Sequence, residues 1–241
     1  DIKKAVTTGN ASISFGNNAE YGKAAGGNAS TLTAINVEAT AGDIKDSVTT
    51  GTATITINKD AKVGTGAANS DIKGVSVTAV NGIAGAVKVG ESGTTLIEIG
   101  NDATAGDTGA SNITGVEVTA TGTGTAKNLG AVTVGNVTIS AGNDVTAATA
   151  GEITGVNVKA ADAAGNITGA VSVGTVSISA GNDVQQFGGV GITGASVTAG
   201  ADIQKDVSIA DGGSVSITIG NGADKAAENG DVKGAVVEAT A

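Results

Sequence analysis

The feature that most constrains how this chain folds is a set of short phrases that recur about every 40 residues. Residues 172–184 read SVGTVSISAGNDV, residues 133–145 read TVGNVTISAGNDV, and residues 94–103 give the looser version TTLIEIGNDA. Alignment on an Ile-x-x-x-Val pattern followed by a Gly turn divides all 241 residues into a single array of six units, 1–42, 43–82, 83–127, 128–165, 166–201 and 202–241. A period of this length is typical of solenoids, propellers and other repeat arrays.

Each unit contains three phrases in which β-branched residues alternate with polar ones. In the first unit they are DIKKAVTT, ASISF and TLTAINVEA. Period-2 alternation of this kind predicts strands, about eighteen in total, and almost no helix. The chain has 40 Gly, three aromatic residues and no Pro, Met or Trp, so it has side chains for thin, regular layers but not for one thick core. The fold class is therefore all-β.

The link between the first two phrases is a short Gly turn, such as Gly9-Asn10 or Gly135-Asn136. Such a turn fits a hairpin and fits equally well the corner of a solenoid coil, and periodicity does not separate the two. Three architectures follow: a β-solenoid (β-helix) of six units with three short strands each, a six-bladed propeller-like fold, or stacked antiparallel units. A propeller blade needs four strands and usually aromatic packing motifs, so we favour the solenoid.

Charge and residue content exclude several classes of function. The formal net charge of −10 argues against binding to nucleic acid or to anionic membranes. No apolar run is long enough for a transmembrane helix, and Asp1-Ile2-Lys3-Lys4 is patterned like the body of the chain, so neither membrane insertion nor a signal peptide is expected. The chain lacks His, Cys and Arg, so we expect no enzyme and assign no catalytic residue.

The two ends of the sequence are alike. The opening DIKKAV matches DIKDSV at 43–48, and the closing VEATA repeats the phrase at 37–41 that precedes Gly42 and DIKDSV. We therefore expect the ends to stack head to tail on another copy or on flanking repeats, and a contact of this type that does not close gives a filament. The expected junction lies in residues 1–8 and 232–241 and includes Asp1, Ile2, Val6, Val232, Val236, Val237 and Ala239.

A Gly-Asn-Asp phrase ends the second strand of three units. Oxygen ligands on repeated Gly-rich turns suit Ca²⁺, and the phrase resembles the RTX-type calcium-binding repeats of secreted bacterial toxins and adhesins, although the nonapeptide of that family is absent. The other interpretation is a turn in which Asn and Asp bond their own backbone and stack along the solenoid, and we favour it because Asn and Asp do this wherever turns repeat. No cofactor is required, and Ca²⁺ is the one candidate, with Asn101, Asp102, Asn143, Asp144, Asn182 and Asp183 as its residues.

In composition and repeat style the whole chain resembles microbial extracellular β-repeat proteins of the surface-layer, extracellular-filament and solenoid-adhesin type. The resemblance implies a secreted or cell-surface location and a self-assembling structural role, with copies of the chain as partners. The alternative is the binding module or stalk of an adhesin, with cell-surface glycans or other cells as partners. Its contact surface would be the loops 19–31, 60–71, 103–111, 145–152, 184–191 and 222–231, with Tyr21 and Phe187 as anchors.

Overall fold

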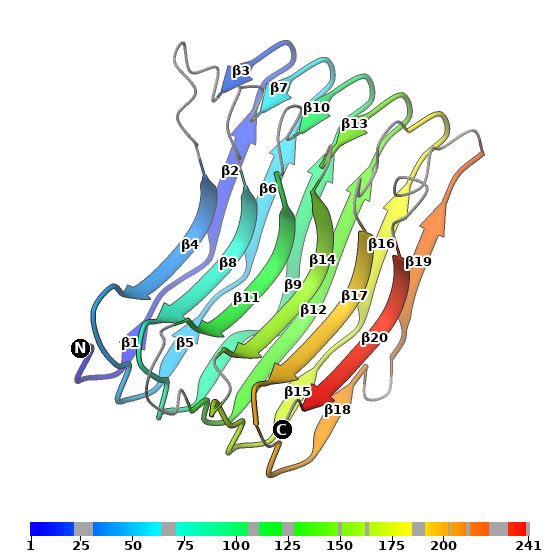
Figure 1. Ribbon diagram of the computed structural model, residues 1–241. Coiled ribbons are helices and arrows are strands. Elements are labelled where there is room, and N and C mark those ends of the chain that lie inside the picture. The colour runs from blue at the N-terminus through cyan, green and yellow to red at the C-terminus, as the bar shows by residue number, and fades with distance from the viewer. Residues whose placement is uncertain are drawn as a thin grey trace.

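The chain folds into a parallel β-solenoid, as the sequence predicts (Figure 1). The structure is a computed structural model and describes residues 1–21, 31–63, 71–105, 111–121, 128–148, 151–161, 164–184, 191–201, 203–210, 213–221 and 231–239. These ranges contain twenty strands and no helix. Every strand pair is parallel, so the propeller and the antiparallel stack are both wrong.

Three sheets run along the solenoid. The long sheet consists of β4 (Leu32–Ala39), β8 (Ile72–Ala79), β11 (Ile113–Ala120), β14 (Glu152–Ala160), β17 (Gly191–Ala199) and β20 (Asp231–Ala239). The split sheet has a first part, β1 (Val6–Thr7), β5 (Val48–Thr50), β15 (Val171–Val173) and β18 (Val207–Ile209), and a second part, β2 (Ala11–Phe15), β6 (Ala53–Ile57), β16 (Val176–Ala180) and β19 (Val215–Ile219). Two of its strands, β9 (Val87–Ile99) and β12 (Val132–Ala141), span both parts. The short sheet consists of β3 (Glu20–Tyr21), β7 (Lys62–Val63), β10 (Thr104–Ala105) and β13 (Thr146–Ala147).

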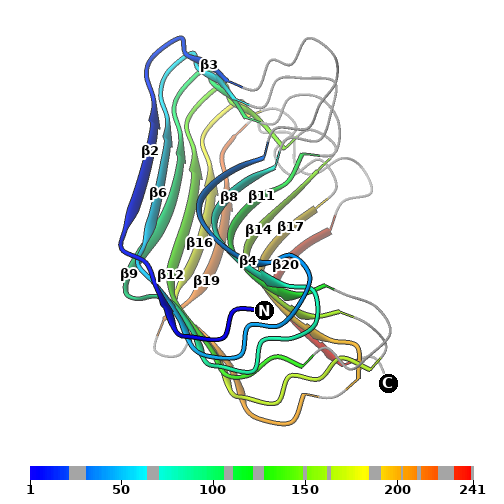
Figure 2. The ribbon, with the colours of Figure 1, turned by 90° about the vertical axis from the view of Figure 1, so that its left-hand side faces the viewer.

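We call each layer of the stack a rung. Equivalent residues pair from rung to rung at spacings that range from 36 residues, between Val171 and Val207, to 46 residues, between Ile83 and Leu129. The six strands of the long sheet are joined by five pairings, so the chain makes about five turns, slightly fewer than a count of six complete units. Figure 2 looks along the stack and shows the rungs superimposed, with the split sheet and the long sheet on opposite sides of the interior.

The number of strands in a rung differs from the three expected. The Gly turn between the first two phrases is neither a hairpin nor always a corner, because in β9 and β12 the two phrases form one continuous strand with a bulge between Val134 and Asn136. The short sheet adds a strand that the sequence did not predict, because two residues are too few to show a period-2 pattern.

The interior is built from files of like residues, one residue from each rung. At the corner before the split sheet, single bridges join Ile2, Ile44, Ile83, Leu129, Ile167 and Ile203. In the second part of the split sheet, Ile55, Ile97, Ile139 and Ile178 are fully buried and lie in register. Because these files repeat one shape, β-branched side chains fill most of the narrow space, and Phe15, in the first rung, is the one aromatic residue among those described that packs against the core.

A file of glycines lets the long sheet approach the split sheet closely. A Cβ on Gly115 would overlap Val137 Cγ1, one on Gly155 would overlap Val176 Cγ1, and each would also meet a backbone oxygen of the next glycine in the file. We call this file, Ala34, Gly74, Gly115, Gly155, Gly194 and Gly234, the slots. The opposing file in the split sheet, Ala11, Ala53, Thr95, Val137, Val176 and Val215, provides the knobs.

Each slot receives the knob of the following rung, so that Gly74, in the second rung, faces Thr95 Cγ2 of the third. The first slot differs from the others in both of its residues. There the register places Ala34, which has a Cβ, opposite Ala53, which lacks the branched side chain of the later knobs. The combined volume of the slot and knob side chains thereby stays nearly constant, as close packing requires.

Candidate functional site

The first rung is the outermost layer at one end of the described stack. Among the described residues, β1, β2 and β4 pair only with strands of the second rung. Asp1, Ile2 and Val6 all lie in this rung: Ile2 pairs with Ile44 and packs against the core, and Val6 is half-buried. Asp1 Oδ1 accepts a hydrogen bond from the backbone N–H of Asp43 at 3.0 Å, and its carboxylate lies 2.8 Å from Lys45 Nζ.

The sixth rung is the outermost layer at the other end of the described stack. In the part of the chain that the structure describes, β18, β19 and β20 pair only with strands of the fifth rung. Val232 and Val237 are 47% and 52% exposed, although their equivalents in β17, Ile192 and Val197, are fully buried. Ala239 is exposed at the end of the same strand. The predicted junction residues therefore lie on open sheet edges at opposite ends of the stack.

Val236 differs from the other predicted junction residues because it faces outward. It pairs with Ser196, and the same file contains Asn157 and Glu117, which are the polar side chains of the outer face. Val237, the next residue, occupies the inward file. The two adjacent valines of β20 thus have different surroundings, which a substitution experiment can use.

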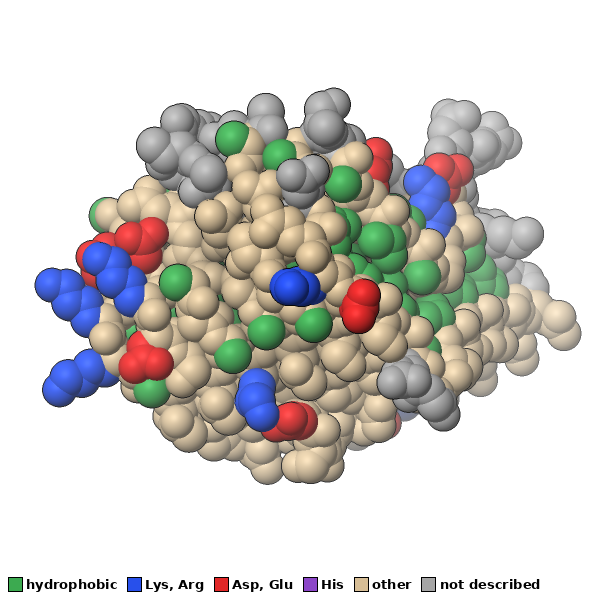
Figure 3. Space-filling model, turned by 90° about the horizontal axis from the view of Figure 1, so that it is seen from below, with side chains coloured by type: hydrophobic (Ala, Val, Ile, Leu, Met, Phe, Trp, Pro, Cys, Tyr) green, Lys and Arg blue, Asp and Glu red, His purple; other side chains and the backbone are tan. Residues whose placement is uncertain are grey.

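The two ends also differ in their side chains. Lys side chains project from the N-terminal end of the face in Figure 3, whereas hydrophobic side chains gather toward the opposite end. The contrast agrees with the exposed Lys3 and Lys4 in the first rung and the exposed valines in the last.

The Gly-Asn-Asp turns form a ladder of hydrogen bonds between rungs. Asn101 Oδ1 accepts the backbone N–H of Asn143 at 2.9 Å, Asn143 Oδ1 accepts that of Asn182 at 2.9 Å, and Asn182 Oδ1 accepts that of Asn221 at 3.1 Å. The turn interpretation was right about stacking but wrong about the partner, since the bond goes to the next rung and not to the turn's own backbone.

The aspartates that follow these asparagines occupy the left-handed region of backbone conformation. Asp102, Asp144 and Asp183 have φ of 58°, 55° and 54°, and Asp102 lies 3.6 Å from Lys59 Nζ. Asn and Asp tolerate this conformation better than other residues, which gives the phrase a role in the turn itself. Among the described residues, no group of three or more His, Cys, Asp or Glu side chains is arranged to hold a metal ion. Calcium binding by this ladder stays a prediction.

Every ladder of this type has the same direction. The side-chain oxygens of Asn10, Asn112 and Asn136 likewise accept a backbone N–H of the following rung, at 2.9, 2.9 and 3.0 Å. The acceptor is always on the earlier rung and the donor always on the later one. These side-chain-to-backbone hydrogen bonds therefore give the stack a polarity along its axis.

Of the two aromatic residues expected to anchor a ligand, the structure describes one. Tyr21 is 38% exposed in β3 and lies against Phe15, with ring centroids 5.4 Å apart. Phe187 lies outside the described residues, as do most residues of the variable loops.

Two hollows that the described residues line lie on the outer face of the long sheet. One hollow of about 510 Å³ lies over β4 and β8 and is lined by Thr33, Asn36, Glu38 and Ser76, among others. A second, of about 190 Å³, lies over β8, β11 and β14 and is lined by Asp71, Asn112, Glu152 and Asn157, among others. Lys73 borders both hollows, and its Nζ forms a partly buried ion pair with Glu117 Oε2 at 2.6 Å.

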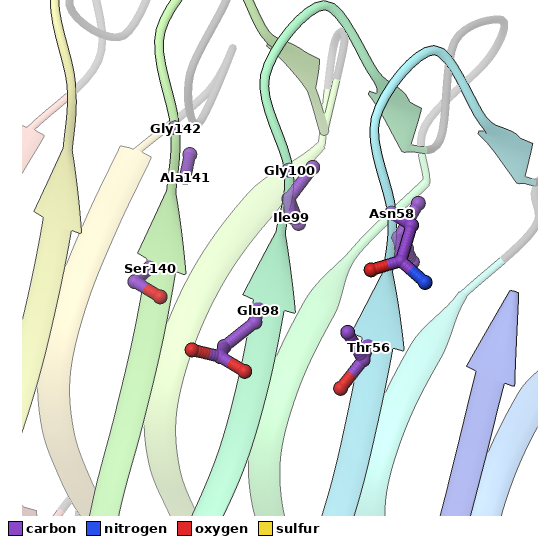
Figure 4. Close-up of a pocket in the computed structure, with 9 residues that line it drawn as sticks. Thr56, Asn58, Glu98, Ile99, Gly100, Ser140, Ala141 and Gly142 are labelled. Carbon is purple, nitrogen blue, oxygen red and sulfur yellow. The ribbon is translucent and has the colours of Figure 1, made fainter. Parts of the chain in front are cut away.

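The outer face of the second part of the split sheet is a regular array of hydroxyl groups that is interrupted in β9. Thr56, Glu98 and Ser140 lie in a row on β6, β9 and β12, next to a hollow of about 340 Å³ (Figure 4). Ten of the twelve outward positions in the two files of this face are Ser or Thr: Ser12, Thr54, Thr138, Ser177 and Ser216 in one, and Ser14, Thr56, Ser140, Ser179 and Thr218 in the other. Leu96 and Glu98 are the exceptions, so the row in Figure 4 contains one carboxylate among hydroxyl groups.

Sequence reasoning missed the slots and the Lys73–Glu117 pair. The slots had a visible signal, because Gly occupies the same place in IKGV, ITGV, ITGA and VKGA. The ion pair had none, because it joins residues 44 positions apart whose contact depends on the exact register of β8 and β11.

Within the described ranges, no helix has the length and apolar character needed to cross a membrane. When the chain is compared with family models, with curated proteins and with solved structures, none of the three comparisons yields a match.

Proposed function

We propose that this protein is a structural, self-assembling extracellular protein, a filament or surface-coat subunit that polymerises head to tail through its open β ends. One observation carries the proposal: three open strands at one end of the described stack match three at the other in direction and, to within one residue, in length. β19 and β2 each have five residues, β20 has nine and β4 eight, and β18 has three and β1 two. A second copy placed on the last rung would continue all three ladders.

Apolar burial supports this stacking. Val232 and Val237 occupy inward files whose members in the preceding rung are fully buried. A following rung would cover them as β20 covers Ile192 and Val197. Unpaired strand edges attract other strands unless charge or a covering element protects them, so pairing with another copy would also satisfy the exposed backbone groups.

The polarity of the side-chain ladders supports a head-to-tail contact over a head-to-head one. Asn221 continues the ladder of Asn101, Asn143 and Asn182 on the last rung. If it follows their geometry, its oxygen meets the backbone N–H of Asn17 in the first rung of the next copy. A head-to-head contact would instead place donors against donors.

The proposal is tested by electron microscopy and sedimentation of the purified chain, in EDTA and in millimolar calcium. Filaments or sheets are expected in both buffers. Val237→Lys places a charge in the inward file of the open end and should abolish assembly, whereas Val236→Lys, one residue away on the outward file, should leave it intact. Single particles in both buffers at every concentration, or equal effects of the two substitutions, would refute head-to-tail stacking.

A second candidate function is the binding module or stalk of an adhesin. The observation that favours it is the pair of polar hollows that lie side by side on the outer face of the long sheet and share Lys73. Their hydroxyl, amide and carboxylate groups suit a ligand rich in hydroxyl groups, such as a cell-surface glycan. Retention of the wild-type chain on a glycan array, with loss of retention in Lys73→Met, would favour this function over the structural one.

The extracellular location belongs to the same proposal. It rests on the resemblance in composition to surface-layer, filament and adhesin proteins, and calcium would be an accessory ligand in either function. Immunogold labelling of intact source cells would test the location directly.

A further inference from the structure

The slots and knobs bear on how two copies would meet. Because each slot receives the knob of the following rung, the stagger leaves one slot and one knob without a counterpart in the described rungs. The slot is Gly234: the one atom near an added Cβ there is Val215 Cγ1 at 4.0 Å, in contrast to the overlaps at Gly155 and Gly194. The knob is Ala11, which is half-buried at the open edge of β2.

We propose that Gly234 receives Ala11 of a second copy of this chain and that this contact fixes the register of the junction. The inference rests on the proposed head-to-tail assembly and adds the residues that align the two copies. A shift of β20 by one residue along β4 of the next copy would place Lys233 or Ala235 against the knob in place of the glycine. Lys233 would hold the two sheets apart. The shift that brings Ala235 to the knob would turn Val232 and Val237 out of the interior, so a single register combines close approach with apolar burial.

The chain itself shows which side-chain combinations fit. A glycine slot accepts a β-branched knob, as in Gly115 with Val137 and Gly74 with Thr95. An alanine slot occurs in the first rung, where the knob has been reduced to Ala53. The overlap of an added Cβ on Gly115 with Val137 Cγ1 indicates that an alanine slot excludes a valine knob.

The junction combines a glycine slot with an alanine knob, so it is underfilled relative to the interior of the solenoid. Ala11→Val would add two methyl groups to a space of the kind that Val137 and Val176 fill against Gly115 and Gly155. Burial of two methyl groups should lower the critical concentration for assembly roughly tenfold. Gly234→Ala alone should leave assembly close to wild type, because alanine against alanine is the combination found at Ala34 and Ala53.

The experiment is a double-mutant cycle on the critical concentration, measured by sedimentation and light scattering for wild type, Ala11→Val, Gly234→Ala and the double variant. The expected signature is a reversal of sign: Ala11→Val promotes assembly when residue 234 is glycine and hinders it, by roughly tenfold or more, when residue 234 is alanine. Circular dichroism at concentrations below assembly checks that all four chains are equally folded.

The outcomes separate this inference from the proposed function. A wild-type chain that never assembles overturns both. A wild-type chain that assembles, with the same effect of Ala11→Val in either background, overturns the docking of Ala11 into Gly234 and leaves head-to-tail assembly in place. Should the double variant fail to fold, the cycle is completed with copies that carry Gly234→Ala mixed with copies that carry Ala11→Val, which meet only across a junction; no loss of co-assembly there would overturn the docking.

Discussion

Replacement of Thr50 by valine should stabilise the protein. Thr50 is the last residue of β5, is 4% exposed, and points into the interior. In the later rungs the same file contains Val89, Val134 and Val173, which are buried apolar residues. Thr50 Oγ1 is buried and has no hydrogen-bond partner among the described residues, and the same is true of Thr8 Oγ1 at the equivalent position of the first rung.

The size of the effect follows from the chemistry of the substitution. Valine and threonine have nearly the same shape, so Thr50→Val exchanges an unsatisfied buried hydroxyl for a methyl group without opening a cavity. Burial of a hydroxyl without a partner costs about 1–3 kcal/mol in proteins. We therefore expect the free energy of unfolding to rise by about 1–2 kcal/mol, which for a chain of this length raises the Tm by roughly 2–8 °C.

Thermal and urea denaturation followed by far-ultraviolet circular dichroism measure the effect. Thr54→Val is the matched control, since Thr54 lies in the same rung but faces outward from β6, where its hydroxyl meets solvent. The control should shift stability by no more than about 0.5 kcal/mol. If Thr50→Val leaves the midpoint unchanged relative to Thr54→Val, or lowers it, the hydroxyl has a partner such as a bound water and the reasoning from an unsatisfied group is wrong.

Three further predictions concern other contacts. Gly155→Ala should cost about 1–3 kcal/mol of stability by overpacking an interior slot, and Val176→Ala should restore part of this loss in the double variant. Denaturation measurements in which the two effects simply add would contradict the slot geometry. Asn143→Ala should lower the free energy of unfolding by about 1 kcal/mol, equally in EDTA and in calcium, because it removes a hydrogen-bond acceptor between rungs. A loss of Tm that differs between the two buffers would point to a metal site instead. Glu238→Lys should lower the critical concentration at low salt, because head-to-tail stacking would place Glu238 beside Glu38 of the next copy; persistence of the gain at 1 M salt would argue against this charge pair.

The architecture could be predicted from the sequence because the repeat of about 40 residues sets both the position of the strands and their stacking. Ile55, Ile97 and Ile139 recur at the same place in their phrases, and that recurrence is what aligns them in a file. The continuous strands β9 and β12 could not be predicted. A bulge and a corner have the same Gly-containing sequence, and they differ only in whether strand pairing with the next rung continues past the turn.

The candidate site could be predicted from the sequence less completely than the fold, for a related reason. The likeness of the two chain ends pointed to Ile2 and Val232 as edge residues. It did not reveal that slots meet the following rung, because the stagger between two sheets is a property of their packing and leaves no mark in either strand alone. The outward position of Val236 was missed because a run of two valines conceals which of them continues the inward alternation.

The stacking of long rungs has a mechanical consequence. Each rung contains between 36 and 46 residues yet adds only about 4.8 Å to the length of the stack. The same residues drawn out straight would span roughly 120–160 Å. Because a rung contacts only its neighbours, a tensile load on one end would peel rungs singly. A coat built from such chains would yield in steps under tension. Each released rung would become more than twentyfold longer before any covalent bond came under strain.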